Sequence, residues 1–259
     1  MTDKVRLEQR GKTLVVTIQR PERRNCVDGE TAGALEAAVT RFRDDEGLAV
    51  LVLTGAGGQA FCSGADLSDL AGLSERPGAW QSGPMGCTRL ADVGKPTIAA
   101  IDGYCTAGGL ELACWCDLRV ASAGAQFGVL NRRWGVPLVD GGTQRLPRLV
   151  GLGNALYLIE TGVLIDAMHA LRMGLVQEVL TDGPALPRAL ALAEAMAAVP
   201  QRGLRNDRAA ALAGCGLPLE AGLEKELEAH ATTLGDPEIV QAIARFAAGD
   251  RPAPLRPAD

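Results

Sequence analysis

Histidine, excess positive charge and long apolar runs are scarce or missing in this chain of 259 residues. Two histidines and a formal net charge of −5 leave it without the basic footprint of a nucleic-acid-binding protein. Its apolar runs are shorter than a membrane span, and its first ten residues lack the apolar stretch of a secretory signal. We therefore expect a cytoplasmic protein with neither nucleic acid nor a membrane as a partner.

Metal-binding and nucleophilic motifs are also missing. The seven cysteines are scattered, and Cys114 and Cys116 stand without the second pair that a zinc site requires. An odd number of such thiols fits a reducing compartment. The G-x-S-x-G motif of serine hydrolases is absent, and His169 and His230 lie in predicted helices, which argues against a catalytic triad. We predict neither a metal site nor nucleophilic catalysis.

The order of apolar segments predicts an α/β fold. Residues 5–20 alternate around Gly11 like a β-hairpin, and helical and strand patterns then follow one another to about residue 185. Beyond that point only helical patterns remain. We expect an α/β core over residues 1–185 and a helical C-terminal region over residues 186–259, with helices at 187–199, 204–214, 219–234 and 237–249.

A glycine-rich loop after one buried strand imitates a nucleotide-binding motif. Residues 55–60 read GAGGQA, which matches the dinucleotide pattern G-x-G-x-x-A. That pattern needs a helix directly after it, whereas this loop continues through Phe61 to Asp66. A nucleotide site is therefore disfavoured.

The most informative segment is residues 103–118, which read GYCTAGGLELACWCDL. Gly108 and Gly109 precede Glu111 and an apolar run, an order typical of a loop that enters a helix. The first N–H groups of a helix are unpaired and stabilise oxygen anions, and glycine lets a ligand approach the backbone. A second glycine-bearing loop, Phe61–Asp66, follows another strand. Convergence of the two loops would create a two-donor oxyanion site; two unrelated turns are the alternative.

Five segments, in the same order along the chain, resemble the crotonase (enoyl-CoA hydratase/isomerase) superfamily. They read RPERRN at 20–25, FCSGADL at 61–67, KPTIAAIDGYCTAGGLELACWCDLRVAS at 95–122, AQFGVLNRRWGVPLVDGGTQRLPRLVG at 125–151 and ALRMGLVQEVL at 170–180. The similarity covers nearly the whole chain. It implies an α/β fold that is a crotonase-like spiral of ββα units with a helical C-terminal region.

The resemblance implies an acyl-CoA thioester as the ligand, with coenzyme A present as part of the substrate and no separate cofactor. The backbone N–H groups of Ala65 and Gly108 would bind the thioester oxygen and stabilise the enolate that develops there. Asp66 is expected to cap a helix rather than act as an acid. The residues implied to contact coenzyme A are Arg23, Arg24, Cys26, Ala60, Gly64, Asp66, Leu67 and Gly109.

The two catalytic glutamates of the family's hydratases match this sequence at one position only. Glu111 matches the first and would act as a general acid/base. The second falls on Asn131, which exchanges no proton at neutral pH. Asp140 offers another carboxylate, either for proton transfer or as the N-cap of the following helix. Trp134 would either line the acyl pocket or pack in the core.

These residues leave three functional hypotheses. The first is an enoyl-CoA hydratase-type lyase that uses Glu111, with Asp140 as its partner, on a 2-enoyl-CoA thioester. The second is an isomerase, hydrolase or dehalogenase centred on Asp140, and the third is a non-catalytic homologue that binds CoA esters or RNA. The apolar stripes of residues 186–259 and the resemblance together predict self-association, and the resemblance implies a homotrimer or a dimer of trimers.

Overall fold

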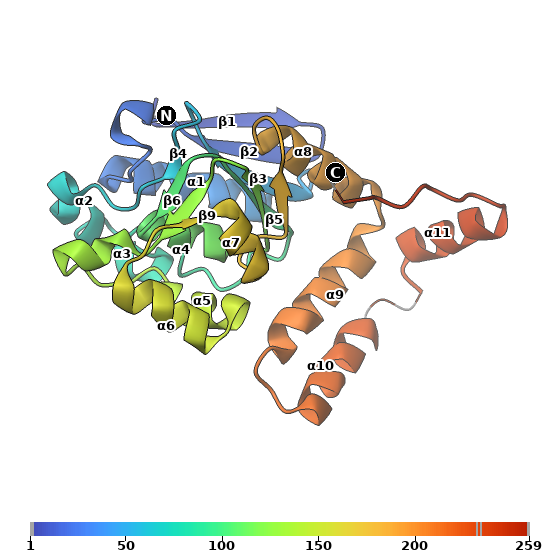
Figure 1. The fold of residues 1–259 in the computed structure, drawn as a ribbon. Helices are drawn as coiled ribbons and strands as arrows, with labels where there is room; N and C mark the ends of the chain where they lie inside the picture. Colours follow the sequence, from blue (N-terminus) through green and yellow to red (C-terminus); the bar gives the residue numbers. More distant parts are fainter. Residues whose placement is uncertain (1–2, 232, 234, 258–259) are drawn as a thin grey trace.

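The computed structural model describes residues 3–231, 233 and 235–257 (Figure 1). Residues 232 and 234, which fall in the helix predicted at 219–234, lie outside the described residues, as do residues 1–2 and 258–259 at the ends of the two predicted regions. The chain forms two β-sheets with surrounding helices, followed by helices that extend away from them (Figure 1).

The larger sheet begins with the hairpin that the N-terminal alternation predicts. β1 (Val5–Arg10) and β2 (Thr13–Ile18) pair antiparallel across a turn in which Gly11 has a φ of +58°. The later strands add in parallel because each follows a long crossover, which gives the order β1-β2-β3-β5-β7-β10. They are β3 (Val50–Gly55), β5 (Thr97–Ile101), β7 (Leu118–Ser122) and β10 (Glu178–Leu180).

The smaller sheet collects the second strand of each successive unit. Strands β3, β5 and β7 of the larger sheet are each followed by a strand of the smaller one, whose order is β4-β6-β8-β9. Helical residues come after β4, β6 and β8, so the predicted spiral of ββα units is confirmed. The strands of the smaller sheet are β4 (Ala60–Cys62), β6 (Tyr104–Thr106), β8 (Gln126–Gly128) and β9 (Ile165–Asp166).

The spiral brings three segments to one edge of the smaller sheet. β4, β6 and β8 are parallel neighbours, so the residues that follow them emerge at the same edge. These residues lead into η2 (Leu67–Asp69), α4 (Gly108–Trp115) and η3 (Leu130–Trp134). Both glycine-bearing loops therefore reach the same edge.

Both faces of the larger sheet are buried at its inner strands β2, β3 and β5, which explains why these strands read as continuous apolar runs. In β3, Leu51 and Leu53 face the main core, whereas Val50 and Val52 face a second core. α8 (Leu186–Ala198) covers the second core with small apolar side chains. The sequence predicts a separate helical region from residue 186 onward. Its first helix, α8, instead packs on the larger sheet.

The remaining helices surround the sheets or connect their strands. The helical pattern after the first turn forms α1, whose N-cap Asp28 accepts a hydrogen bond from Thr31 N at 2.8 Å. Within the described ranges, no helix has the length and apolarity needed to cross a membrane. The helices that surround the sheets or connect their strands are η1 (Pro21–Arg23), α1 (Gly29–Asp44), α2 (Leu70–Ser74), α3 (Ala79–Ser82), α5 (Gly142–Val150), α6 (Leu152–Thr161) and α7 (Ala167–Arg172).

The helices that extend from the sheets begin with α9 (Gln201–Gly214), followed by α10 (Leu219–Ala231) and α11 (Pro237–Ala247) (Figure 1). Arg208 ties α9 to the rest of the chain, because its guanidinium pairs with Asp117 at 2.8 Å. Large apolar side chains of α10 and α11 remain exposed, namely Leu219, Leu223, Leu227, Val240, Ile243 and Phe246.

Close packing between α4 and β4 makes Gly109 hard to replace. A Cβ added at Gly109 would lie 2.0 Å from the backbone carbonyl oxygen of Cys62. We expect Gly109→Ala to lower the free energy of unfolding by about 1–3 kcal/mol. Gly153→Ala in α6 is the matched control, because it meets open space and should raise that energy by about 0.4–1 kcal/mol. Urea unfolding compares the two, and equal stabilities would contradict this account.

Candidate active site

A cavity of about 520 Å³ lies where β4, β6 and β8 end, a size usual for small-molecule sites. Ala65 follows β4, Gly108 follows β6 and Asn131 follows β8, and all three line the cavity. Glu111 and Asp140 line it too. The structure therefore brings together the two glycine-bearing loops and both candidate acids.

A short parallel ladder holds the loop that follows β4. Val27 N donates to Gly64 O at 2.9 Å, and Asp66 N donates to Val27 O at 2.7 Å. Successive N–H groups of an extended chain point to opposite sides, so the N–H of Ala65 points away from Val27. No described residue accepts a hydrogen bond from it. Ala65 therefore offers a free donor on the cavity wall.

A strained residue orients a second free donor. Ala107 has a φ of 52° and a ψ of −126°, a conformation that residues with a side chain rarely adopt. α4 begins directly after it with Gly108, whose N–H is also without an acceptor in the described part of the chain. A Cβ built on Gly64 would lie 3.0 Å from the Gly108 nitrogen, so the two loops are in contact.

Glu111 is held by one carboxylate oxygen. Its Oε1 accepts hydrogen bonds from Asp140 N at 2.9 Å and from Gly142 N at 2.8 Å. Gly142 must be glycine for this approach, because a Cβ there would lie 2.8 Å from Glu111 Cγ. No described group donates to Oε2, which is not fully enclosed by protein. The second oxygen is therefore available for chemistry in the cavity.

Asp140 repeats this arrangement. Its Oδ1 accepts hydrogen bonds from Met85 N at 3.0 Å and from the Thr88 hydroxyl, and no described group donates to Oδ2. The alternative reading of Asp140 as a helix cap is wrong, because Gly141 is the N-cap of α5 and the carboxylate is bound elsewhere. Each acid thus has one anchored oxygen and one free oxygen.

Burial raises the pKa of both acids. Removal from water raises the pKa of Glu111 to about 7, the negative charge of Asp140 adds to this effect, and the N–H donors oppose it. Burial likewise raises the pKa of Asp140, against hydrogen bonds from Thr88 and Met85 that lower it. A pKa near neutrality, as at Glu111, suits an acid for proton transfer at neutral pH.

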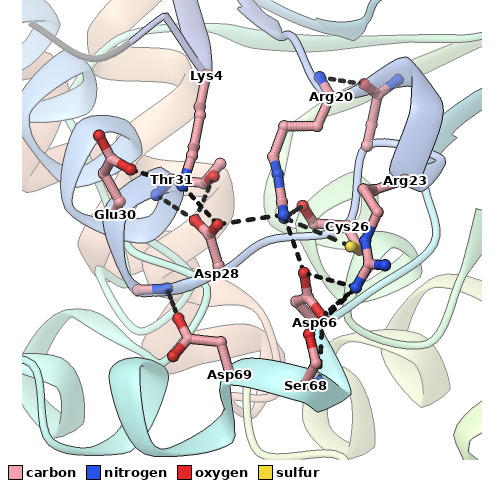
Figure 2. A network of polar contacts seen from close by, with 12 residues as sticks. Lys4, Arg20, Arg23, Cys26, Asp28, Glu30, Thr31, Asp66, Ser68 and Asp69 are labelled. Carbon is pink, nitrogen blue, oxygen red and sulfur yellow. Dashed lines mark hydrogen bonds and ion pairs between the residues drawn. The ribbon is translucent and has the colours of Figure 1, made fainter.

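The residues implied to contact coenzyme A divide into three groups. Arg24 and Leu67 line the cavity, and the Arg24 guanidinium lies 5.3 Å from the centre of the Tyr104 ring. Arg23 is half exposed and pairs with Asp66 at 3.1 Å (Figure 2). The third group is buried and comprises Cys26, Ala60, Gly64, Asp66 and Gly109. These coenzyme A contacts stay predictions.

The sequence allows two interpretations of Asp66, as a helix cap or an acid, and two of Trp134, as a pocket or a core residue. The structure decides between them. Asp66 is confirmed as a cap, since its side chain accepts from Ser68 N at 3.1 Å at the start of η2. Trp134 lines the cavity and is 74% exposed, so the reading that packs it in the core is wrong.

Asn131 lies at the position that the resemblance assigns to a second glutamate. Its Nδ2 donates to Val136 O at 2.7 Å, and its buried Oδ1 has no partner among the described residues. An amide exchanges no proton at neutral pH. Glu111 and Asp140 are the carboxylic acids among the residues that line the cavity.

Sequence reasoning missed the groups that hold Asp140. Met85 and Thr88 lie between α3 and β5, in a turn where Gly83 has a φ of +101°. A Cβ on Gly83 would lie 2.8 Å from Asp140 Oδ1, so this glycine is the one local signal of the contact. The strain at Ala107 left no signal, because alanine is unremarkable before a helix.

A family profile described as enoyl-CoA hydratase/isomerase matches residues 8–252. The chain belongs to the enoyl-CoA hydratase/isomerase family. Within this family it is 36% identical over 226 residues to a crotonyl-CoA hydratase from Syntrophomonas wolfei, with 86% of each chain covered. It is 33% identical over 243 residues to a short-chain-enoyl-CoA hydratase from Clostridium acetobutylicum, with 93% of each covered.

Solved structures of enoyl-CoA hydratases share the fold of this family member. The enoyl-CoA hydratase EchA1 from Mycobacterium marinum superimposes with a TM-score of 0.90 at 32% identity, covering 97% of this chain and 98% of that one. An enoyl-CoA hydratase from Mycobacterium tuberculosis H37Rv gives 0.90 at 30% identity, with the same coverage. The predicted crotonase-like architecture is thereby confirmed.

The raised pKa of Glu111 makes stability depend on pH. The folded protein binds a proton between pH 4.5 and about 7 that the unfolded chain releases, so the associated stability is present below pH 4.5 and lost as pH rises through about 7. Glu111→Gln removes this titration and keeps an acceptor for both N–H groups. We expect its stability relative to the native protein to rise by up to about 3 kcal/mol between pH 4.5 and about 8.

Urea unfolding at several pH values across this range measures the difference. A gap between the two proteins that does not change with pH would contradict the raised pKa of Glu111.

Proposed function

We propose that the chain is an enoyl-CoA hydratase, a lyase that adds water across the C2–C3 double bond of a 2-enoyl-CoA thioester. The observation that carries this proposal is the meeting of two free N–H donors and two buried carboxyl groups in one cavity. The hydratase activities named for relatives 33% and 36% identical support it. A homologue that only binds CoA esters or RNA would have no use for the paired acids.

In this proposal the N–H groups of Ala65 and Gly108 bind the thioester carbonyl oxygen. When water attacks C3, the electrons of the double bond move toward C2 and negative charge develops on that oxygen. Two donors fixed in advance stabilise the charged form more than the neutral carbonyl. Each donor of this kind contributes about 2.7–4 kcal/mol to transition-state stabilisation.

Glu111 and Asp140 share the proton transfers. Asp140 takes a proton from water as the water oxygen bonds to C3, and Glu111 gives a proton to C2. Burial and the charge of Asp140 raise the pKa of Glu111 to about 7, so about half of the Glu111 side chains hold a proton at pH 7 and can give it to C2. Transfer of the proton from Asp140 to Glu111 then returns both carboxyl groups to their starting protonation states.

Coenzyme A enters as part of the substrate in this scheme, and we propose no other cofactor. Arg24 lines the cavity and is the candidate contact for a coenzyme A phosphate. No cluster of three or more His, Cys, Asp or Glu side chains in the described ranges could hold a metal ion. We place the enzyme in the cytoplasm, where its seven free thiols would stay reduced.

A second candidate reaction is double-bond migration centred on Asp140. Asn131, which stands where the family's hydratases have their second glutamate, is the observation that favours it. Asp140 would take a proton from C2 of a 3-enoyl-CoA and a proton would be returned to C4, which moves the double bond from C3–C4 to C2–C3, so no water is activated. Hydrolysis and dehalogenation centred on Asp140 belong to the same alternative.

Removing either acid should nearly abolish hydration. We expect Glu111→Gln and Asp140→Asn each to lower kcat for crotonyl-CoA by about 10²–10⁴-fold, because each loses one proton transfer. Loss of the ultraviolet absorbance of the conjugated thioester measures the rate. Glu160→Gln, at an exposed acid of α6, is the control and should leave kcat unchanged. Activity within a few-fold of native in Glu111→Gln would contradict the assignment.

The same variants separate hydration from migration when a 3-enoyl-CoA is also tested. If migration is the native reaction, Asp140→Asn loses it, Glu111→Gln keeps most of it, and the native protein hydrates 2-enoyl-CoA slowly. If hydration is the native reaction, 2-enoyl-CoA is the faster substrate. A gain of hydration in Asn131→Glu would show that the amide limits water addition.

We also propose that the chain self-associates, as a homotrimer or a dimer of trimers. Leu219, Leu223 and Leu227 recur every four residues on α10 and are 78%, 53% and 69% exposed. Such a stripe on one helix face is the pattern of a surface that another subunit covers.

Charges placed in this stripe should prevent assembly. We expect light scattering to give the mass of a trimer or hexamer for the native protein and a mass near that of the monomer for the double variant Leu223→Lys/Leu227→Lys. A lysine left unpaired in an apolar interface opposes association. Leu255→Lys, in the segment after α11, is the control. A monomeric native protein would contradict self-association.

A further inference from the structure

An ion network joins the N-terminal segment to the loop that carries Ala65 (Figure 2). Arg20 is at its centre, with a side chain that is only 11% exposed. Its Nη1 donates to the carbonyl oxygen of Cys26 at 2.6 Å, and its Nη2 donates to Asp66 Oδ2 at 2.9 Å. Cys26 precedes Val27 and Asp66 follows Ala65, so one guanidinium contacts both sides of the ladder.

We propose that Arg20 is a positioning residue that fixes the direction of the Ala65 N–H, and this rests on the oxyanion role proposed for that N–H above. Two backbone hydrogen bonds alone leave a short ladder free to twist. A planar guanidinium bonded to both sides fixes their separation and their relative angle. Arg20 acts from outside the cavity, whose lining in the described chain includes Arg24 but not Arg20.

The rest of the network holds Arg20 in place. Asp28 accepts from Arg20 at 3.2 Å and from Lys4 at 2.7 Å while its other oxygen caps α1. Burial works to raise the pKa of Asp66, but hydrogen bonds from Ser68 and Arg20 outweigh it and hold the pKa well below its usual range. The ion pair therefore persists over the pH range in which the cavity acids titrate.

Arg20→Lys is the most specific test. It keeps the positive charge and removes the planar guanidinium, which donates to two acceptors at once. An ammonium is a single point of contact and cannot hold Cys26 O and Asp66 in the same geometry. A misdirected donor weakens binding of the enolate-like transition state more than binding of the substrate. We expect kcat for a 2-enoyl-CoA to fall about tenfold or more while KM stays within about threefold.

Arg188→Lys is the matched control. Arg188 donates two hydrogen bonds to Glu178, at 2.6 and 2.8 Å, and this pair between α8 and β10 is also largely buried. We expect both variants to lose thermal stability to a similar extent and only Arg20→Lys to lose kcat. A native kcat in folded Arg20→Lys would overturn the proposal.

Acetoacetyl-CoA provides a readout that needs no turnover. This β-ketothioester binds in its keto form or as an enolate that absorbs in the near ultraviolet, and donors directed at its oxygen favour the enolate. We expect the same bound enolate fraction in the native protein and Arg188→Lys, and a smaller fraction in Arg20→Lys. An unchanged fraction in Arg20→Lys would overturn the proposal.

These readouts separate the role of Arg20 from the proposed function. If the native protein hydrates no 2-enoyl-CoA but the enolate fraction falls in Arg20→Lys, hydration is wrong and the positioning role stands. If hydration occurs and the fraction does not fall, the positioning role is wrong. Should Arg20→Lys not fold, Asp66→Asn keeps the side-chain shape, removes the charge that Arg20 binds, and must show the same loss of enolate.

Discussion

The parallel pairing of β4, β6 and β8 is the constraint on which the site depends. Each of these strands is three residues long, yet their alignment decides which loops share an edge. Ala65, Gly108 and Asn131 are far apart in sequence and meet only because the strands before them are neighbours. The larger sheet supplies the rigidity, since its inner strands are buried on both faces and deliver the chain to the smaller sheet in register.

The sequence predicts the fold and the part of the site formed by the glycine pair and Glu111. The physical reasons can be identified. Buried strands, amphipathic helices and a glycine pair before Glu111 are local patterns, and the resemblance adds their order. The role of Asp140 is not local. Beside two glycines it also fits a helix cap, and the groups that decide against this, Met85 and Thr88, lie 55 and 52 residues away. No periodicity records a contact of that kind.

Charge and amphipathicity mislead for the same reason. Arg20, Arg23 and Arg24 are close together in the sequence and carry the same charge. Asp66, more than 40 residues further on, binds the first two, and Arg24 remains on the cavity wall. The helical patterns after residue 185 likewise look alike, although α8 covers the sheet and α9 leaves it. Tertiary partners, which the local pattern does not contain, decide both outcomes.

The backbone conformation of Ala107 fixes the direction of the Gly108 N–H before substrate binds. Its left-handed φ of 52° strains the chain where a glycine would rest without cost. A glycine would also let the Gly108 amide sample several orientations before substrate arrives, and each encounter would then have to select one of them. Alanine restricts the orientations of the Gly108 amide before substrate binds. The protein thereby carries backbone strain beside the candidate active site, and the amide needs no rearrangement when substrate arrives.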